Sequence, residues 1–345
     1  MKRSKRLDRG VVRITGDDTE TFLQGLISND IRRADGTHGL YAALLTPQGK
    51  YLFDFFIVRD GDALLVDCYR EDIDLFVKKL TIFKLRSKVT LEDVSTDYNV
   101  YTFFGDDVAA TLSMESDQHK TDEGCILYTD PRLEQAGVRG FVSSSVDVTS
   151  WGEDASDDIY HYHRISLGLV EAPLDLIKDK SILLESGFDE LSGVDWKKGC
   201  YMGQELTART KYRGLIKKRL IPIKITDGAP EPGAMISYAG KTVGDLRSIS
   251  DDMAIAMLKL DAIQNADTLE LEGATAAPVV PHWMQLPKPD DEADNAPRVA
   301  GVHLYHDGPS CARVRAEFCV ELLGSFVVIF VYSLCAFVDR CTEGH

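Results

Sequence analysis

The residues with the clearest chemical character lie between 197 and 219, in the stretch KKGCYMGQELTARTKYRGLIKKR. It holds eight basic residues and one acidic residue, although the whole chain carries a formal net charge of −16. Clustered Lys and Arg side chains focus a local positive field, and Arg binds carboxylates and phosphates in bidentate fashion. We expect these side chains to cluster without neutralisation and to bind an anion. They are Lys197, Lys198, Arg209, Lys211, Arg213, Lys217, Lys218 and Arg219.

A single cysteine, Cys200, lies in this basic stretch between Gly199 and Gly203. An isolated cysteine is most often a small buried apolar residue. Neighbouring lysines and a nearby helix N-terminus favour the thiolate form, so we favour a reactive or ligand-binding role. One cysteine cannot hold an iron–sulfur cluster, which usually needs four protein ligands, but it could supply one ligand to a shared cluster or act as a nucleophile. No His or Asp partner is recognisable, which disfavours a cysteine hydrolase.

The two glycines predict a tight loop that leads into a short helix over residues 203–209. On that helix Glu205 and Arg209 stand four residues apart and could form an ion pair. The alternative to a binding site is therefore a turn, a helix with one salt bridge and a basic entry to a strand.

The composition sets the wider limits. A chain of 345 residues exceeds one typical core, so we expect two or three domains. The acidic balance argues against a general nucleic-acid coat protein. The seven cysteines are odd in number and include no C-x-x-C pair, which disfavours a zinc ribbon and a disulfide framework and favours a reducing compartment. The basic start MKRSKRLDRG leads into no apolar region, so we do not expect a signal peptide, and it is too short to indicate a transit peptide.

Residues 11–100 predict a compact α+β unit. Asp17 or Asp18 could cap a first helix whose apolar residues follow at helical spacing. The turns TPQG and Asp60-Gly61 predict hairpins between apolar runs. A second helix is expected over 70–84, with one apolar stripe. The strands are expected over 11–15, 40–45, 50–58, 63–68 and 86–94.

Residues 101–148 resemble a second, weaker α+β unit. The acidic stretch WGEDASDD predicts a joint near 151–158, and a helix is expected from about 157 to 169. Short strands with turn signals from 220 to 275 predict a small antiparallel barrel or sandwich.

The residues from 286 to 345 differ from the rest, with a polar, Pro-rich linker followed by an apolar segment, 322–338, of 17 uncharged residues. A bilayer-spanning helix needs about 20 apolar residues. We therefore favour a buried or poorly formed terminal segment over a membrane anchor.

The run from Lys198 to Glu205, KGCYMGQE, with Arg209 following, resembles the K-G-C-[FY]-x-G-Q-E-x-x-x-R signature of the YgfZ/Iba57 (CAF17) family, folate-binding relatives of the glycine-cleavage T-protein. Other segments agree in order: ITGDDTETFLQGLISNDI, LLTPQGKYLFDFFIV, FKLRSKVTL and ILLESGFDELSGVDWKKGCY. The resemblance covers residues 8–275 and not the tail.

The resemblance implies an α+β, T-protein-like fold of two related α+β units around a central channel, followed by a C-terminal antiparallel β-barrel. It assigns 8–215 to a folate-binding, aminomethyltransferase-like domain and 216–280 to the barrel, and leaves 286–345 as a linker and atypical tail. It also implies tetrahydrofolate, or a one-carbon derivative, as cofactor and a role in assembly or repair of iron–sulfur proteins, including tRNA-modifying enzymes.

The resemblance likewise implies the site residues. Cys200 matches the distinctive family cysteine. Asp54 is the one carboxylate left at the position of the T-protein's aspartate pair, of which one member is catalytic. We expect cofactor contacts from Asp54, Tyr160, Lys198, Gly199, Tyr201, Gly203, Gln204, Glu205 and Arg209, and we expect no resident metal.

The sequence departs from the T-protein at two points. Phe53-Asp54 stands where the transferase has two aspartates, and Cys200 stands inside the motif, so ordinary glycine cleavage is disfavoured. Asp54 could still pair with the pterin, or be a strand residue hydrogen-bonded in a turn. Arg9 and Tyr160 correspond to positions where some relatives place tryptophans against folate; Tyr160 could stack on a pterin.

Three functions remain open in this order. The first is a folate-dependent maturation factor that binds iron–sulfur client or assembly proteins. The second is a one-carbon transferase on an unknown acceptor, with Asp54 as general base. The third is an RNA-binding module, for which only Tyr201 and Tyr212 offer aromatic rings among the basic residues. We expect a monomer, cytoplasmic in a bacterium or in the mitochondrial matrix of a eukaryote.

Overall fold

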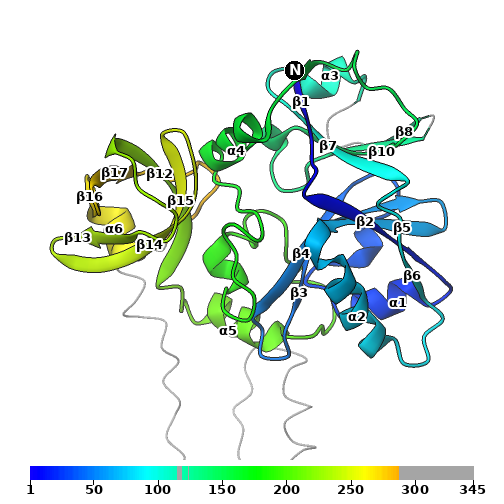
Figure 1. The fold of residues 1–345 in the computed structure, drawn as a ribbon. Coiled ribbons are helices and arrows are strands. Elements are labelled where there is room, and N and C mark those ends of the chain that lie inside the picture. Colours follow the sequence, from blue (N-terminus) through cyan, green and yellow to red (C-terminus); the bar gives the residue numbers. More distant parts are fainter. Residues whose placement is uncertain (115–118, 123, 287–345) are drawn as a thin grey trace, which may run out of the picture. The chain divides into compact units, whose positions relative to one another are not determined.

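The computed structural model describes residues 1–114, 119–122 and 124–286. All of them belong to the compact unit Met1–Ala296. Figure 1 shows two sheets with their helices and a small barrel. The α+β fold and the C-terminal antiparallel β-barrel that the sequence predicts are confirmed.

A five-stranded antiparallel sheet is built from the first hundred residues in the order β3-β4-β5-β2-β6. Both predicted hairpins form, with β3 paired to β4 and β4 paired to β5. Successive side chains of a strand point to opposite faces, so Phe53 and Phe55 face the helices whereas Asp54 and Phe56 face the interior. The strands are β2 (Arg9–Thr15), β3 (Leu40–Leu45), β4 (Tyr51–Asp60), β5 (Ala63–Tyr69) and β6 (Thr90–Asp93).

Two helices cover the outer face of this sheet. Helix α2 (Ile73–Lys84) follows a 3-10 turn (Arg70–Asp72), which accounts for the predicted 70–84 segment. Helix α1 (Thr19–Gln24) begins after Asp18 as expected, but the predicted side-chain cap is wrong. The Asp18 carboxylate instead accepts a hydrogen bond from the Lys88 N–H at 2.7 Å. The Asp18 carboxylate is thus bonded to the backbone N–H of a residue 70 positions away and not to an N–H of the first turn of α1.

A second sheet has the order β11-β1-β7-β10-β9-β8. Its strand β1 was not predicted, because KRSK shows no apolar alternation, although Arg3 and Ser4 are buried. The predicted joint at 151–158 contributes β11, which pairs in parallel with β1. The strands are β1 (Lys2–Lys5), β7 (Tyr98–Phe104), β8 (His119–Asp122), β9 (Cys125–Thr129), β10 (Val138–Ser143) and β11 (Glu153–Asp154), with α3 (Val108–Thr111) after β7.

Helix α4 (Asp157–Ser166) leads out of the second sheet, is shorter than predicted and contacts β14 and β15 of the barrel. The barrel closes in the order β12-β15-β14-β13-β16-β17 around a separate apolar core. Its elements are β12 (Lys218–Gly228), β13 (Met235–Tyr238), β14 (Lys241–Ser250), β15 (Met253–Lys259), α6 (Leu260–Asn265), β16 (Leu269–Leu271) and β17 (Ala274–Pro278). Helix α5 (Gln204–Tyr212) forms where the glycine pair predicts it.

No helix in the described part of the chain is both long and apolar enough to span a bilayer. The apolar segment 322–338 lies outside the described residues.

Candidate functional site

Cys200 lies in the short loop before α5, and its side chain is exposed. The adjacent Gly199 has open space around it, since a Cβ built there would meet no atom within 4 Å. Within the described residues no group of three His, Cys, Asp or Glu side chains could hold a metal ion. A metal centre at Cys200 would therefore need ligands from outside this part of the chain.

Lys198 holds the loop in place through hydrogen bonds to the backbone of residues 27–29. Its Nζ donates to the carbonyl oxygens of Ile27 and Asn29, both at 2.7 Å, and the side chain is buried. Burial lowers the pKa of Lys198 to about 8. The Asp195 carboxylate accepts from the N–H groups of Lys197 and Lys198 at 2.7 and 3.0 Å. Lys198 thus serves the loop's structure, with its charge directed at the protein's own backbone.

The remaining signature residues also hold the loop. The Gln204 side chain accepts from the Tyr201 N–H at 3.2 Å, and Tyr201 is buried, which raises its pKa to about 12. Gly203 has φ +81° and lies against the β3–β4 turn. Glu205 and Arg209 form the predicted i, i+4 ion pair on the exposed side of α5. Together these contacts fix the loop that presents Cys200.

Half of the basic residues in this stretch are neutralised by ion pairs, contrary to the expectation from its composition. Carboxylates from residues 185–190 approach it from another segment, and counting charges along the sequence cannot detect them. Four of the eight basic residues, Lys197, Lys198, Arg213 and Lys217, have no ion partner within 4 Å in the described chain, although Lys198 is hydrogen-bonded to backbone carbonyl oxygens. The pairs are Lys211–Asp189, Lys218–Glu185 at 3.9 Å and Arg219–Glu190 at 2.8 Å, besides Arg209–Glu205.

Asp54 is buried on the interior face of β4. Its two carboxylate oxygens accept hydrogen bonds from the hydroxyls of Tyr41, at 3.0 Å, and Tyr51, at 2.7 Å. Burial and the adjacent carboxylate raise the pKa of both tyrosines well above the usual value. The tyrosines therefore remain hydrogen-bond donors to Asp54.

Three arginines surround the ring of Phe56, two residues along the same strand. The guanidinium carbons of Arg139, Arg132 and Arg9 lie 3.9, 4.8 and 5.8 Å from its centroid. Asp67 accepts from both Arg9 and Arg139 at 2.6 Å. Arg9, one of the two positions matched to folate tryptophans, is thus held inside an ion-pair network.

Tyr160, the other matched position, lies on α4 and is buried. The Arg6 guanidinium carbon sits 4.0 Å from its ring centroid, and Phe104 meets it edge-on at 5.7 Å between centroids. Its ring already has partners from this chain.

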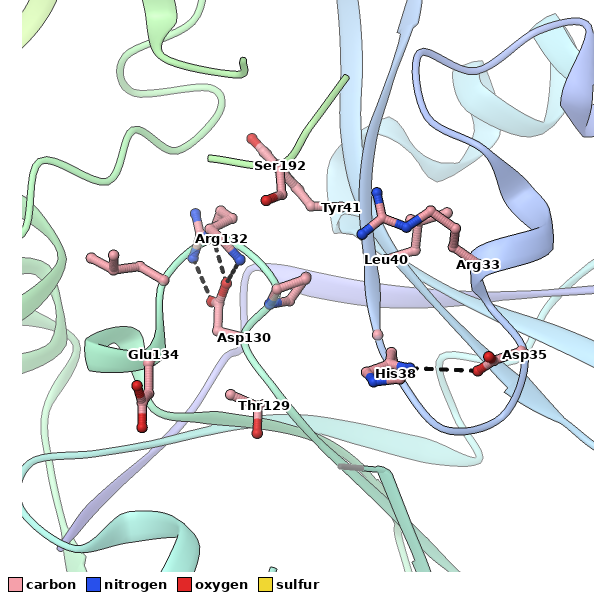
Figure 2. A pocket seen from close by; sticks show the side chains of 13 residues that line it. Arg33, Asp35, His38, Leu40, Tyr41, Thr129, Asp130, Arg132, Glu134 and Ser192 are labelled. Carbon is pink, nitrogen blue, oxygen red and sulfur yellow. Dashed lines mark hydrogen bonds and ion pairs between the residues drawn. The ribbon is translucent and has the colours of Figure 1, made fainter. Parts of the chain in front are cut away.

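A pocket of about 670 Å³ opens beside this network (Figure 2). Figure 2 shows Arg33, Asp35 and His38 on one side and Asp130 and Arg132 on the other. None of the nine residues predicted to contact the cofactor lines it; Tyr41, the Asp54 partner, does. The pocket is lined by Arg33, Asp35, His38, Gly39, Leu40, Tyr41, Thr129, Asp130, Pro131, Arg132, Leu133, Glu134 and Ser192.

The pocket fits a folate-sized molecule in size and chemistry. Ligand pockets typically span about 300–1,000 Å³ and combine apolar walls with a few polar groups. Tyr41 lies at the inner wall of the pocket, where it is 1% exposed and its ring packs against Phe56 and Phe188. The Arg33 side chain is 57% exposed and 3.8 Å from its nearest carboxylate, Asp195, so it can still bind an anion. Arg139, whose Nε and Nη1 have no hydrogen-bond acceptor among the described residues, is buried beside Asp130 but does not line the pocket.

Sequence reasoning missed this pocket because its residues belong to no recognised motif. The DPRLE run at 130–134 carries the only local signal, a turn-forming Asp-Pro followed by an arginine. The Arg132 side chain turns back onto Asp130, with two contacts of 3.0 and 2.8 Å.

Comparisons with known proteins bear on the family and the fold of the chain. Residues 217–286 match the family described as the CAF17 C-terminal beta-barrel domain. The chain is 37% identical over 250 residues to "Iron-sulfur cluster assembly factor IBA57 homolog, mitochondrial" of Mycosarcoma maydis, covering 68% of this chain and 60% of that protein. It is 31% identical over 302 residues to "Iron-sulfur cluster assembly factor IBA57, mitochondrial" of Homo sapiens, covering 81% and 84%.

The chain spans less than two thirds of the length of some relatives. The matched region covers 60% of the Mycosarcoma maydis protein and 65% of the Neurospora crassa homologue. Among solved structures it is similar to the glycine cleavage system aminomethyltransferase T from Bartonella henselae, with a TM-score of 0.68. That likeness covers 82% of this chain and 86% of the other at 12% identity, and it shows the fold alone.

Proposed function

Because the chain belongs to the IBA57 (CAF17) family, we propose that it acts in iron–sulfur cluster assembly in mitochondria. Its clients would include iron–sulfur enzymes, among them those that modify tRNA, and it would work as a monomer. The observation that carries the proposal is the exposed thiol of Cys200 on a loop fixed from below by Lys198.

Cys200 acts as one thiolate ligand of a cluster shared with a partner protein. Thiolates are the usual ligands of iron–sulfur clusters, which need about four of them. The described residues contain no group of three His, Cys, Asp or Glu side chains that could complete such a site. The partner supplies the rest. Lys197 and Lys217, which are exposed and have no ion partner among the described residues, favour an acidic partner surface.

A tetrahydrofolate binds in the 670 Å³ pocket and not along the signature loop. Arg33 and His38 would hold the glutamate carboxylates, and Tyr41 would face the ring system. When bound, the folate supplies a carrier for a one-carbon unit. Tyr41 separates the pocket from Asp54, whose oxygens already accept two hydrogen bonds.

The second candidate, a one-carbon transferase with Asp54 as general base, has less support. A general base must reach the proton that it removes. Asp54 is buried and is not among the residues that line the 670 Å³ pocket. The same observation disfavours glycine cleavage.

The thiol role is tested by complementation. Cys200→Ala and the matched control Gly199→Ala replace neighbouring exposed residues in a strain that lacks its own copy. We expect both variants to keep the wild-type Tm, and only Cys200→Ala to lose the activity of mitochondrial iron–sulfur enzymes. Full rescue by Cys200→Ala would show that the thiol is dispensable.

The folate site is tested separately by calorimetric titration with tetrahydrofolate. Arg33→Gln should weaken binding at least several-fold, whereas Cys200→Ala and Arg209→Ala should bind like the wild type. Equal affinity of wild type and Arg33→Gln, or no binding by either, would remove the folate site and leave the thiol role untouched.

A further inference from the structure

The segment that ends α2 exposes an apolar side chain in a conformation that a leucine adopts only at a cost. Leu85 follows the last residue of α2 with φ 46° and ψ −106°, and it is 88% exposed. The Ser87 N–H donates to the Lys84 carbonyl oxygen at 2.8 Å, which closes a tight turn around Leu85. The first central position of such a turn favours glycine, and a bulky residue there is strained.

Nothing within the described chain compensates for this strain. A side chain that is 88% exposed gains almost no packing. Strained residues persist where the surroundings or the function require them. The stability of this unit therefore does not explain why position 85 is a leucine, and we look for the reason in an interaction with another molecule.

Leu85 continues an apolar line on the outward face of α2. Leu75 and Ile82 are 40% and 59% exposed and stand seven residues apart, which places them on one side of the helix. The inward face is occupied by Ile73, Phe76 and Leu80, which are buried against the sheet. The outward line is thus additional to the apolar stripe that the fold uses.

Basic residues outnumber acidic ones along this line, where Asp74 is the exposed carboxylate of α2. Lys78, Lys79, Lys84 and Arg86 form no ion pair within 4 Å in the described chain, and Lys88 pairs only with the exposed Asp17 at 3.3 Å. The chain as a whole carries −16, so this face stands out against the surrounding field. A surface hollow beside it is lined by Asp18, Leu85, Arg86 and Ser87.

We propose that the α2 face, defined as Leu75, Lys78, Lys79, Ile82, Lys84, Leu85 and Arg86, docks an acidic partner protein that receives Leu85 in an apolar cleft. Charge complementarity selects the acidic partner, and the strained leucine is its anchor. An anionic membrane is the alternative occupant, and the vesicle experiment below distinguishes it from an acidic protein. Single-stranded nucleic acid is disfavoured because the face exposes no aromatic ring for base stacking.

This face is separate from the Cys200 loop. Helix α2 contacts β2 and β6 at one edge of the five-stranded sheet, whereas Gly203 packs against the turn between β3 and β4 at the other edge. The inference therefore does not depend on the role of Cys200.

The test uses two substitutions in the full chain. Leu85→Gly removes the anchor and relieves the backbone, so it should raise Tm by about 2–4 °C while it lowers rescue of the deletion strain. Lys78→Glu with Lys79→Glu should lower rescue at unchanged Tm. A control, Lys241→Glu, replaces an exposed lysine on the barrel and should change neither. Full rescue by both α2 variants would overturn the proposal.

To identify the partner, Leu85 is replaced by the photo-crosslinking amino acid benzoyl-phenylalanine and the crosslinked protein is identified. That protein is then purified on its own for binding measurements. Support requires that the purified protein be acidic, that Leu85→Gly weaken its binding at least 10-fold and that salt weaken it further. A crosslinked dimer of this chain would show a second copy on the face. Phosphatidylserine vesicles that bind the wild type but not the Lys78→Glu, Lys79→Glu variant would show a membrane. Either result overturns the proposal.

Discussion

Gly49 and Gly203 pack backbone against backbone, although they lie 154 residues apart in the sequence. A Cβ at Gly203 would lie 2.5 Å from the Thr46 carbonyl oxygen and 3.0 Å from the Gly49 Cα. A Cβ at Gly49 would lie 2.7 Å from the Gly203 carbonyl oxygen. Both residues have positive φ, +80° and +81°. The loop that carries Cys200 is therefore fixed to the β3–β4 turn by two glycines that require each other.

We expect Gly203→Ala to lower the free energy of unfolding by roughly 1–3 kcal/mol, because the methyl group meets backbone atoms and the positive φ strains it. Gly199→Ala is the matched control: its φ is not positive and the space around it is open, so its effect should stay within about 0.5 kcal/mol. Urea denaturation of both variants measures the difference. Equal destabilisation would contradict the packing described.

A second prediction concerns Asp54 and its two tyrosines. Asp54→Ala leaves the hydroxyls of Tyr41 and Tyr51 buried without an acceptor, which should cost about 2–4 kcal/mol of unfolding free energy. Asp54→Asn keeps one acceptor and adds a donor that a tyrosine oxygen can accept, so it should cost about 1 kcal/mol. Urea denaturation separates the two, and a larger loss for Asn than for Ala would refute the prediction.

A third prediction concerns the ion pairs that join the two sheets. Asp67 on β5 accepts from Arg9 on β2 and from Arg139 on β10 of the other sheet. Asp67→Ala leaves the buried Arg9 guanidinium without its carboxylate and leaves Arg139 only the more distant Asp130, at 3.8 Å, which should cost about 3–5 kcal/mol. Asp62→Ala removes an exposed carboxylate from the β4–β5 turn and serves as the control, with an effect within about 0.5 kcal/mol. Similar unfolding midpoints for the two variants would show that the bridge contributes nothing.

The elements that the sequence predicts correctly are those with local signals. The hairpins around 46–49 and 60–61, α2 and α5 each have a turn residue or an apolar period within a few positions. Strand β1 escapes because its buried residues are Arg3 and Ser4, whose burial depends on partners in β7 and β11. Such a strand becomes recognisable only when its neighbours are known.

The site divides in the same way. Cys200 is found from sequence because its loop is a contiguous motif. The pocket brings together residues around 33–41, 129–134 and 192, which no motif connects. The prediction that the basic residues of 197–219 lack ion partners fails for the same reason. Three of them pair with carboxylates outside the stretch, at Glu185, Asp189 and Glu190. The burial of Lys198 cannot be predicted from its neighbours in the sequence, because its carbonyl partners lie about 170 residues away.

The buried lysine gives a prediction about pH. The pKa of Lys198 falls from 10.5 to about 8 in the folded protein because its ammonium group is buried. Below pH 8 the group is charged in both states, and the folded protein bears the whole cost of burying the charge. Between pH 8 and 10.5 the unfolded chain holds a proton that the folded protein has released, so the free energy of unfolding rises with pH.

Lys198→Met removes this titration and also the two hydrogen bonds to the carbonyl oxygens of Ile27 and Asn29. We therefore expect the variant to be less stable at every pH. The gap between wild type and variant should widen by as much as about 3 kcal/mol from pH 8 to 10.5. Urea denaturation at intervals over this range measures the gap, and other titrating groups cancel because both proteins contain them. Parallel stability curves would mean that Lys198 titrates near its ordinary pKa and that the loop before α5 is open to water.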